Sequence, residues 1–259
     1  MPGKSGWTRN QLLVAFNLYC QMPFGKMHSR NPKIVKYSQL IGRTPSALAM
    51  KLTNIASLDP AIISTGRKGL KGASSADREM WNEMKNDWEH FAAESNQAMV
   101  AVESGSKLEI EQAEMPATDE PIDYTGSSKT ALTKTRIGQG FFRQAVLSAY
   151  NYKCCITGLS VPSLLVASHI VPWREDEKNR LNPSNGLSLS MLHDKAFDIG
   201  IITISEDMTV RVSKKQLSNG DSFYITALLS YDGKPIALPE KFQPNLDFLA
   251  YHRSNIFEQ

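Results

Sequence analysis

The sequence predicts an α+β protein in which an all-α N-terminal domain, of helix-turn-helix or winged-helix-like type, is joined by a flexible linker to a mixed α and β domain. Three observations predict this. Residues 1–98 show helical periodicity with well-placed caps, residues 99–130 are acidic with little periodicity, and residues 131–259 mix helical segments with short alternating strands. A chain of 259 residues is long enough for two domains.

The composition excludes several classes of protein. No apolar run approaches the roughly 20 residues that a membrane span requires. Polar Asn17 and Gln21 interrupt the apolar patch near the N-terminus, so no signal peptide is expected. The three cysteines include an adjacent pair, which is too few for a four-cysteine zinc site and typical of a reduced protein. We therefore expect a cytoplasmic protein without membrane partners.

Charge is distributed unevenly along the chain. Residues 1–75 contain eleven lysines and arginines but one acid, Asp59, a net charge of +10. Such an excess on a foldable segment favours a polyanion partner, most often nucleic acid. A basic surface that is merely solvated is the alternative.

Helix signals within residues 8–56 indicate a DNA-reading pair of helices. Thr8 caps a predicted helix over 8–22, a short helix over 34–41 ends at Gly42, and Thr44 with Pro45 begins a third. In a helix-turn-helix the N-terminal end of the second helix enters the major groove. We therefore expect DNA contacts from five residues, Arg43, Ser46, Met50, Lys51 and Asn54. The Gly/basic segment 66–74 is a candidate wing, and residues 75–97 are predicted to form one long helix.

The C-terminal region alternates between the 3.6-residue period of helices and the two-residue period of strands. In order, the sequence predicts a helix over 138–150, strands over 153–158 and 164–173, a polar loop, a helix over 186–200, two paired strands over 201–207 and 209–213, and a final helix near the C-terminus.

Three polar residues are predicted to converge in this region. His169 ends a strand, Asn185 begins the helix predicted over 186–200, and His193 lies eight residues further on. Eight helical steps of about 100° leave an offset of about 80°, so Asn185 and His193 lie on roughly the same side. A strand-borne histidine, a polar helix start and a helix-borne histidine can then meet.

Several segments, in order, resemble one bacterial branch of the HNH endonucleases, which have the ββα-metal fold. They are "RIGQGFFRQAVLSAYNYKCCITG", "ASHIVPW", "NPSNGLSLSMLHDKAFDIGIITI" and the terminal "YHRSNIF", and they cover about 136–257. The resemblance implies that His169 is the general base, because a neutral imidazole can take a proton from water near pH 7. It also implies that His193 is a metal ligand and that Asn185 holds the loop and orients the imidazole.

The sequence departs from the broader HNH pattern at one ligand. Many members place Asp or His before the catalytic histidine, whereas this chain has Ser168, whose hydroxyl is a poor ligand. Asp198 and Asp194 are candidates for the second ligand, and we choose Asp198. Their alternative interpretation is as solvated acids near a helix end. Oxygen ligands with one imidazole favour a single Mg²⁺ or Mn²⁺ over zinc.

Basic and amide residues of the matching segments suit a phosphate partner, since guanidinium groups bind phosphates bidentately. They are Arg136, Gln139, Arg143, Arg174 and Arg180. Internal salt bridges are the alternative for Arg136 and Arg143. We expect Arg143, Arg174 and Arg180 to bind DNA.

The prediction is therefore a metal-dependent endonuclease for double-stranded DNA, of restriction type. The sequence leaves open a dependence on modified DNA and a homodimer. Two other functions remain: a DNA-binding regulator with a decayed nuclease domain, which Ser168 would favour, and a nuclease effector whose N-terminal domain senses a protein or nucleotide signal.

Overall fold

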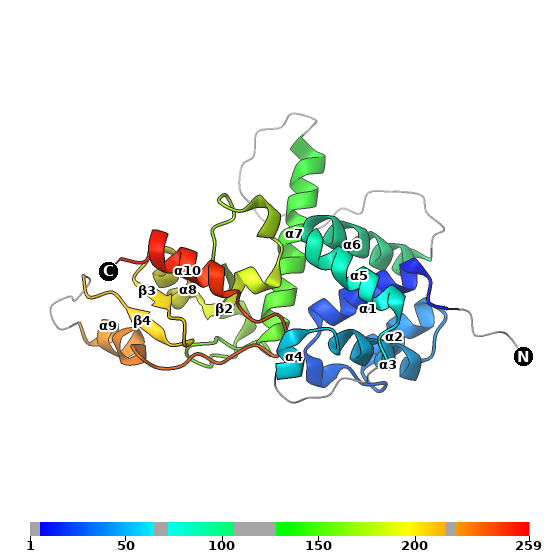
Figure 1. Ribbon diagram of the computed structural model, residues 1–259, viewed down its shortest axis with the longest axis horizontal. Helices are drawn as coiled ribbons and strands as arrows, with labels where there is room; N and C mark the ends of the chain where they lie inside the picture. Colours follow the sequence, from blue (N-terminus) through cyan, green and yellow to red (C-terminus); the bar gives the residue numbers. More distant parts are fainter. Residues whose placement is uncertain (1–5, 65–71, 106–127, 216–220, 259) are drawn as a thin grey trace, which may run out of the picture.

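The computed structural model describes residues 6–64, 72–105, 128–215 and 221–258 (Figure 1). The part before residue 106 is helical, and no strand occurs in its described residues. Its helices are α1 (Arg9–Gln21), α2 (Pro32–Leu40), α3 (Pro45–Ala56), α4 (Pro60–Ser64), α5 (Ser75–Asn86) and α6 (Trp88–Ser104).

Local capping sets the predicted starts of α1 and α3. The Thr8 side chain accepts from the Gln11 N–H and the Thr44 side chain accepts from the Ala47 N–H, each satisfying a donor that the helix leaves free. Gly42 takes a left-handed φ of 66° in the turn between α2 and α3. The paired helices α2 and α3 pack together as expected. Most of the candidate wing lies outside the described residues.

The single helix predicted over 75–97 is wrong. The chain breaks at Asp87, where φ is −146° and ψ is 87°, so that α5 and α6 are separate helices. Asp87 then caps α6, because its side chain accepts from the His90 N–H. The α6 helix continues to Ser104, into the segment that the sequence predicts to be linker, and residues 106–127 lie outside the described residues.

The C-terminal part is built on an antiparallel strand pair and a helix. Its elements are α7 (Ser128–Ala149), β1 (Leu165–His169), β2 (Gly186–Ser190), α8 (Met191–Asp198), β3 (Ile202–Ile204), β4 (Val210–Val212), α9 (Ser222–Ala227) and α10 (Leu246–Asn255). Strand β1 pairs with β2, with Leu165 opposite Ser190 and His169 opposite Gly186. The β3–β4 pair and the final helix confirm the prediction, whereas the strand expected over 153–158 is absent and these residues form turns.

The helix predicted over 186–200 is also wrong in its first five residues. Residues 186–190 form β2, in which Leu187 and Leu189 are fully buried. Ser190 then caps α8 by accepting from the His193 N–H. Asn185 therefore precedes a strand instead of a helix, and the helical offset that brought it together with His193 does not apply.

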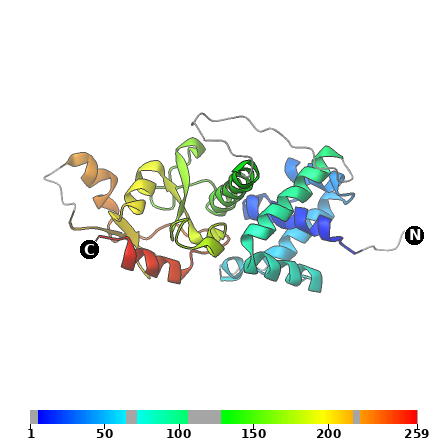
Figure 2. The same cartoon turned by 90° about the horizontal axis from the view of Figure 1, so that it is seen from above.

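Helix α7 joins the two halves of the molecule. It packs on α1 and α6 on one side and on β1 and β2 on the other (Figures 1 and 2). The start of β2 approaches α7 so closely that a Cβ on Gly186 would lie 2.4 Å from Val146 Cγ2. This close approach requires glycine at the residue directly after Asn185.

A C-terminal segment is inserted into the helical N-terminal part. Lys241 is fully buried, and its Nζ donates to the backbone carbonyl oxygens of Tyr19 (2.5 Å), Cys20 (3.0 Å) and Met22 (2.8 Å) at the end of α1. These carbonyls have no partner within the helix, so the ammonium acts as a cap.

The neighbouring Phe242 completes an aromatic cluster. Its ring lies 5.8 Å from Tyr19, 5.7 Å from Trp88 and 6.4 Å from Trp81, the last in a stacked geometry. Asp59 accepts from both the Tyr19 hydroxyl and the Phe242 N–H. The two parts therefore share one core, whereas most of the linker predicted over 99–130 lies outside the described residues and stays a prediction.

Candidate active site

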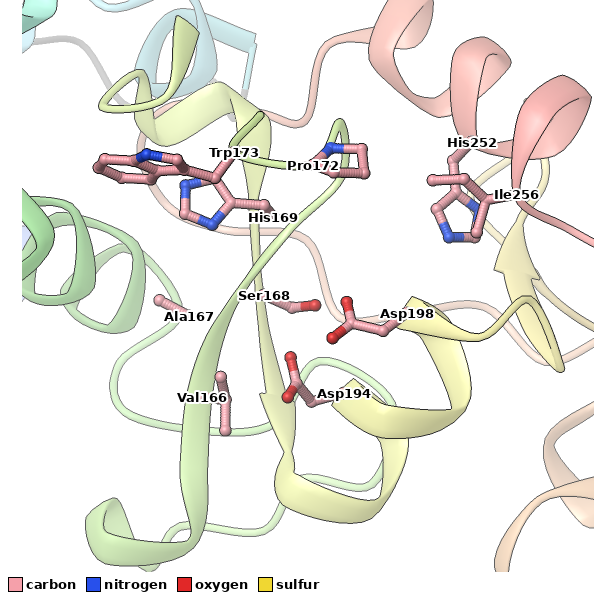
Figure 3. Close-up of a pocket in the computed structure, with 10 residues that line it drawn as sticks. All are labelled: Val166, Ala167, Ser168, His169, Pro172, Trp173, Asp194, Asp198, His252 and Ile256. Atoms are coloured by element: carbon pink, nitrogen blue, oxygen red, sulfur yellow. The ribbon is translucent and has the colours of Figure 1, made fainter. Parts of the chain in front are cut away.

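A cavity of about 450 Å³ opens where β1 ends beside α8. Polar side chains reach it from three elements: Ser168 and His169 from β1, Asp194 and Asp198 from α8, and His252 from α10 (Figure 3). Trp173 and Pro172, in the loop after β1, complete one wall.

His169 is held in one orientation. Its Nε2 lies 2.8 Å from the Arg180 carbonyl oxygen, and its ring stacks on Phe142 at 4.0 Å, with the edge of Trp173 at 5.5 Å. A carbonyl only accepts, so Nε2 carries the proton and Nδ1 keeps its lone pair. Burial lowers the pKa of His169, although the Arg180 carbonyl and the charge of Asp194 oppose the shift. The imidazole is therefore neutral near pH 7, as a general base must be.

Asn185 holds the loop that follows β1. It is fully buried, its Oδ1 accepts from the Val171 N–H (2.8 Å), and its Nδ2 donates to the carbonyls of Val171 (3.1 Å) and Asn179 (3.3 Å). The loop so fixed carries the Arg180 carbonyl to His169. Asn185 thus holds the loop as predicted, but it does not contact the imidazole, whose orientation is set by a hydrogen bond to the Arg180 carbonyl.

Asp194 and Asp198 lie one turn apart on α8, so their side chains share a face. Figure 3 shows both carboxylates directed toward the Ser168 hydroxyl. Burial raises the pKa of Asp194, and burial together with the charge of Asp194 raises the pKa of Asp198. Two carboxylates that disfavour each other's charge in a cavity form a place where a cation is stabilised.

His193, the predicted first ligand, does not line this cavity. It is buried, its Nδ1 lies 2.8 Å from Ser190 Oγ, and its ring meets the edge of Tyr231 at 5.5 Å. The structure therefore brings His169 together with Asp198 and with the second candidate acid, Asp194, but not with His193. The i, i+4 spacing of the two acids was the sequence signal for this pair.

His252 lines the cavity but uses both ring nitrogens. Its Nδ1 lies 2.8 Å from Thr203 Oγ1 and its Nε2 lies 3.0 Å from the Phe197 carbonyl, while the ring stacks on Phe197 at 3.6 Å. The histidine of the "YHRSNIF" segment therefore ties α10 to β3 and α8.

The acids of the cavity fit a hard divalent cation. Among the described residues no group of three or more His, Cys, Asp or Glu is placed to hold a metal ion. Asp194 and Asp198 supply two carboxylates, and Mg²⁺ is commonly held by one or two carboxylates with water and substrate phosphate in its other positions. The donor set thus suits Mg²⁺ or Mn²⁺.

The three arginines predicted to bind phosphate lie close to this region. Arg174 is exposed. The Arg143 Nη2 donates to the Pro162 carbonyl at 3.2 Å. The Arg180 guanidinium lies over the Trp173 ring at 5.1 Å and pairs with Glu177 at 3.0 Å.

Other residues of the protein already engage part of the predicted DNA-reading face of α3. Ser46 and Met50 are exposed, as expected. Lys51 is 6% exposed and pairs with buried Asp77 at 2.7 Å, so its expected place on the exposed face is wrong. Asn54 is half-buried against Gly72, and the Arg43 guanidinium donates to Gly6 and Gln11 and lies over the Trp7 ring at 5.0 Å.

The basic excess of residues 1–75 is partly neutralised from the following helices. Arg9 pairs with Glu83 and Glu94 at 2.8 Å, and Lys36 pairs with Glu103 at 2.6 Å, as Lys51 does with Asp77. All four acids belong to α5 and α6, beyond the segment in which the charge was counted. The N-terminal part therefore offers a polyanion less uncompensated positive charge than residues 1–75 alone indicate.

Comparison with known proteins agrees with this geometry. Residues 154–205 match the family model of the HNH endonuclease, a segment that contains His169, Asn185, Asp194 and Asp198. This segment of the chain therefore matches an HNH endonuclease domain.

A solved structure, a modification-dependent TagI restriction endonuclease, is similar with a TM-score of 0.30 and 21% identity. The match covers 44% of this chain and 37% of that chain. The search of curated proteins found no match. No helix of the described residues is both long and apolar enough to cross a membrane.

Proposed function

We propose that this protein is a divalent-metal-dependent endonuclease for double-stranded DNA, of restriction type. One observation carries the proposal: a neutral imidazole with a free Nδ1 lines the same cavity as a pair of carboxylates. Hydrolysis of a phosphodiester needs an activated water and compensation of the charge that develops on the phosphate. This cavity offers a group for each task.

The residues take distinct roles in this mechanism. His169 accepts the proton of the attacking water at Nδ1, while the Arg180 carbonyl keeps the other nitrogen protonated. Asp194 and Asp198 would hold a divalent cation, which would supply positive charge to offset the charge that develops during phosphodiester hydrolysis. Asn185 is a positioning residue that fixes the loop, and Arg174 contacts a neighbouring phosphate.

The alternative function, a DNA-binding regulator with a decayed nuclease domain, is favoured by Ser168 alone. In the structure the Ser168 hydroxyl faces two carboxylates that α8 supplies (Figure 3). The acidic ligand expected before the catalytic histidine is thus replaced by acids from the helix. This substitution favours an active enzyme.

The N-terminal part has a second candidate role, in which it senses a signal and controls the nuclease through the shared core. The pairing of Arg9, Lys36 and Lys51 with acids favours it. Met50→Glu, on the exposed face of α3, separates the two roles. DNA reading by α3 predicts weaker duplex binding by Met50→Glu than by Val100→Glu, a matched change at an exposed site on α6. Equal binding would favour the sensing role.

The nuclease itself is tested by plasmid cleavage with Mg²⁺ or Mn²⁺, comparing methylated with unmethylated DNA. His169→Ala should lower the rate by roughly 10²–10⁴, the usual worth of a general base. His28→Ala, at an exposed histidine, should cleave as the natural protein does. Cleavage by His169→Ala within tenfold of the natural protein would refute the assignment. Cleavage confined to methylated plasmid would add dependence on modification.

A further inference from the structure

A second cavity, of about 300 Å³, adjoins the first and shares His169 and Trp173 with it. Its walls are apolar and aromatic, from Phe142, Val166, Ala167 and Trp173. Its polar groups are Gln139 and Arg143, both from α7. The proposed catalytic mechanism does not use Gln139, Val166 or Ala167.

The packing of the fold fixes several of the residues that line this cavity. Gln139 and Arg143 lie one turn apart on α7 and therefore share a face. A Cβ on the preceding Gly138 would lie 2.8 Å from Leu181 Cδ1, so glycine lets this turn of α7 approach the loop that carries Arg180. The Arg143 side chain is anchored to the Pro162 carbonyl, and Phe142 is buried with its ring stacked on His169.

This lining suits a flat heterocycle better than a phosphate. Ligand sites typically combine apolar and aromatic walls with a few convergent polar groups. Unstacked bases are bound against aromatic side chains and read along their edges. Glutamine pairs with the N6 and N7 edge of adenine and arginine with the O6 and N7 edge of guanine, so these two side chains favour purines.

We propose that this cavity binds a purine base of the DNA strand next to the scissile phosphate. The inference rests on the proposed function, because it places the cleaved strand across His169. The nuclease part then selects bases at the cut by itself, whatever the N-terminal part recognises. Gln139 and Arg143 are the residues that determine this selection.

The first test maps the ends that the enzyme produces on plasmid DNA. In the natural protein the ratio of purines to pyrimidines at one position beside the break should be roughly five or more, which is the low end for a bidentate base contact. Gln139→Ala and Arg143→Ala should reduce this ratio below about two while cleavage persists. Gln144→Ala is the matched control, since Gln144 lies on the same helix, is exposed and bonds the Tyr152 hydroxyl outside the cavity. Ends without base bias would overturn the proposal.

A second test needs neither metal nor cleavage. In EDTA, the anisotropy of labelled short single strands gives the Kd for oligo(dA) and oligo(dT) of equal length. The full-length protein should bind oligo(dA) about tenfold tighter, Gln139→Ala should lose this preference, and Gln144→Ala should keep it. Equal Kd values for the natural protein would overturn the proposal. A purine preference without plasmid cleavage would support purine binding by the cavity and refute the nuclease activity. Plasmid cleavage without base bias would support the nuclease activity and refute purine binding.

Discussion

Replacing Lys51 with methionine should destabilise the protein without changing how it contacts DNA. The ammonium lies 2.7 Å and 2.9 Å from the two carboxylate oxygens of Asp77, and the two side chains are 7% and 0% exposed. The Asp77 carboxylate also accepts from the Ser74 N–H at the start of α5. Lys51→Met would leave this carboxylate charged, buried and without its cation.

Breaking such a pair costs about 3–5 kcal/mol, because one charge stays buried and uncompensated. In a chain of this size the loss corresponds to a fall in Tm of roughly 6–20 °C, measured by circular dichroism. The double change Lys51→Met with Asp77→Asn removes both charges and should recover more than half of the loss. Lys36→Met, which breaks a pair that is 58% and 41% exposed, should cost less than about 1 kcal/mol.

The competing interpretation makes Lys51 a phosphate contact. It predicts an unchanged Tm, weaker binding to all duplexes and a salt dependence of log K that is flatter by about one unit. Burial of Lys51 predicts a lower Tm, unchanged binding to duplexes and an unchanged salt dependence, provided that binding is measured below the Tm of the variant. A stable Lys51→Met protein with a flattened salt slope would refute the reasoning from burial.

Asp198→Asn should raise the Mn²⁺ concentration for half-maximal cleavage about tenfold or more, whereas His193→Ala should leave the titration unchanged; the reverse result would return the ligand role to His193. Phe242→Ala should cost about 3–5 kcal/mol in urea unfolding, as for other buried aromatic residues, and a loss below 1 kcal/mol would contradict the shared core. Burial lowers the pKa of His252 from 6.5 to about 4. Between these values the unfolded chain binds more protons, so stability should fall by about 3 kcal/mol as pH drops from 6.5 to 4. A Tm that does not change between pH 6.5 and 4 would contradict the lowered pKa of His252. His252→Gln should remove the pH dependence of the Tm.

Features set by near neighbours could be predicted from the sequence. Thr8 and Thr44 bond to N–H groups three residues away, so the starts of α1 and α3 follow from local chemistry. The motif segments made His169, Asn185, His193 and Asp198 candidates, and the structure brings His169 and Asp198 but not His193 to the cavity. The four-residue spacing of Asp194 and Asp198 likewise fixes their common face on any helix.

Other features depend on partners that are distant along the chain. Residues 186–190 form a strand because β1 pairs with them, and that pairing decides which α8 side chains reach His169. Lys51 is buried because α5, 26 residues further on, brings Asp77 to it. Lys241 donates to the end of α1 although more than 200 residues separate the two, a contact that no local pattern in the sequence indicates. Capping and helical spacing act within one turn, where sequence separation equals spatial separation, but burial, strand pairing and charge neutralisation are settled by contacts that form only when the whole chain is packed.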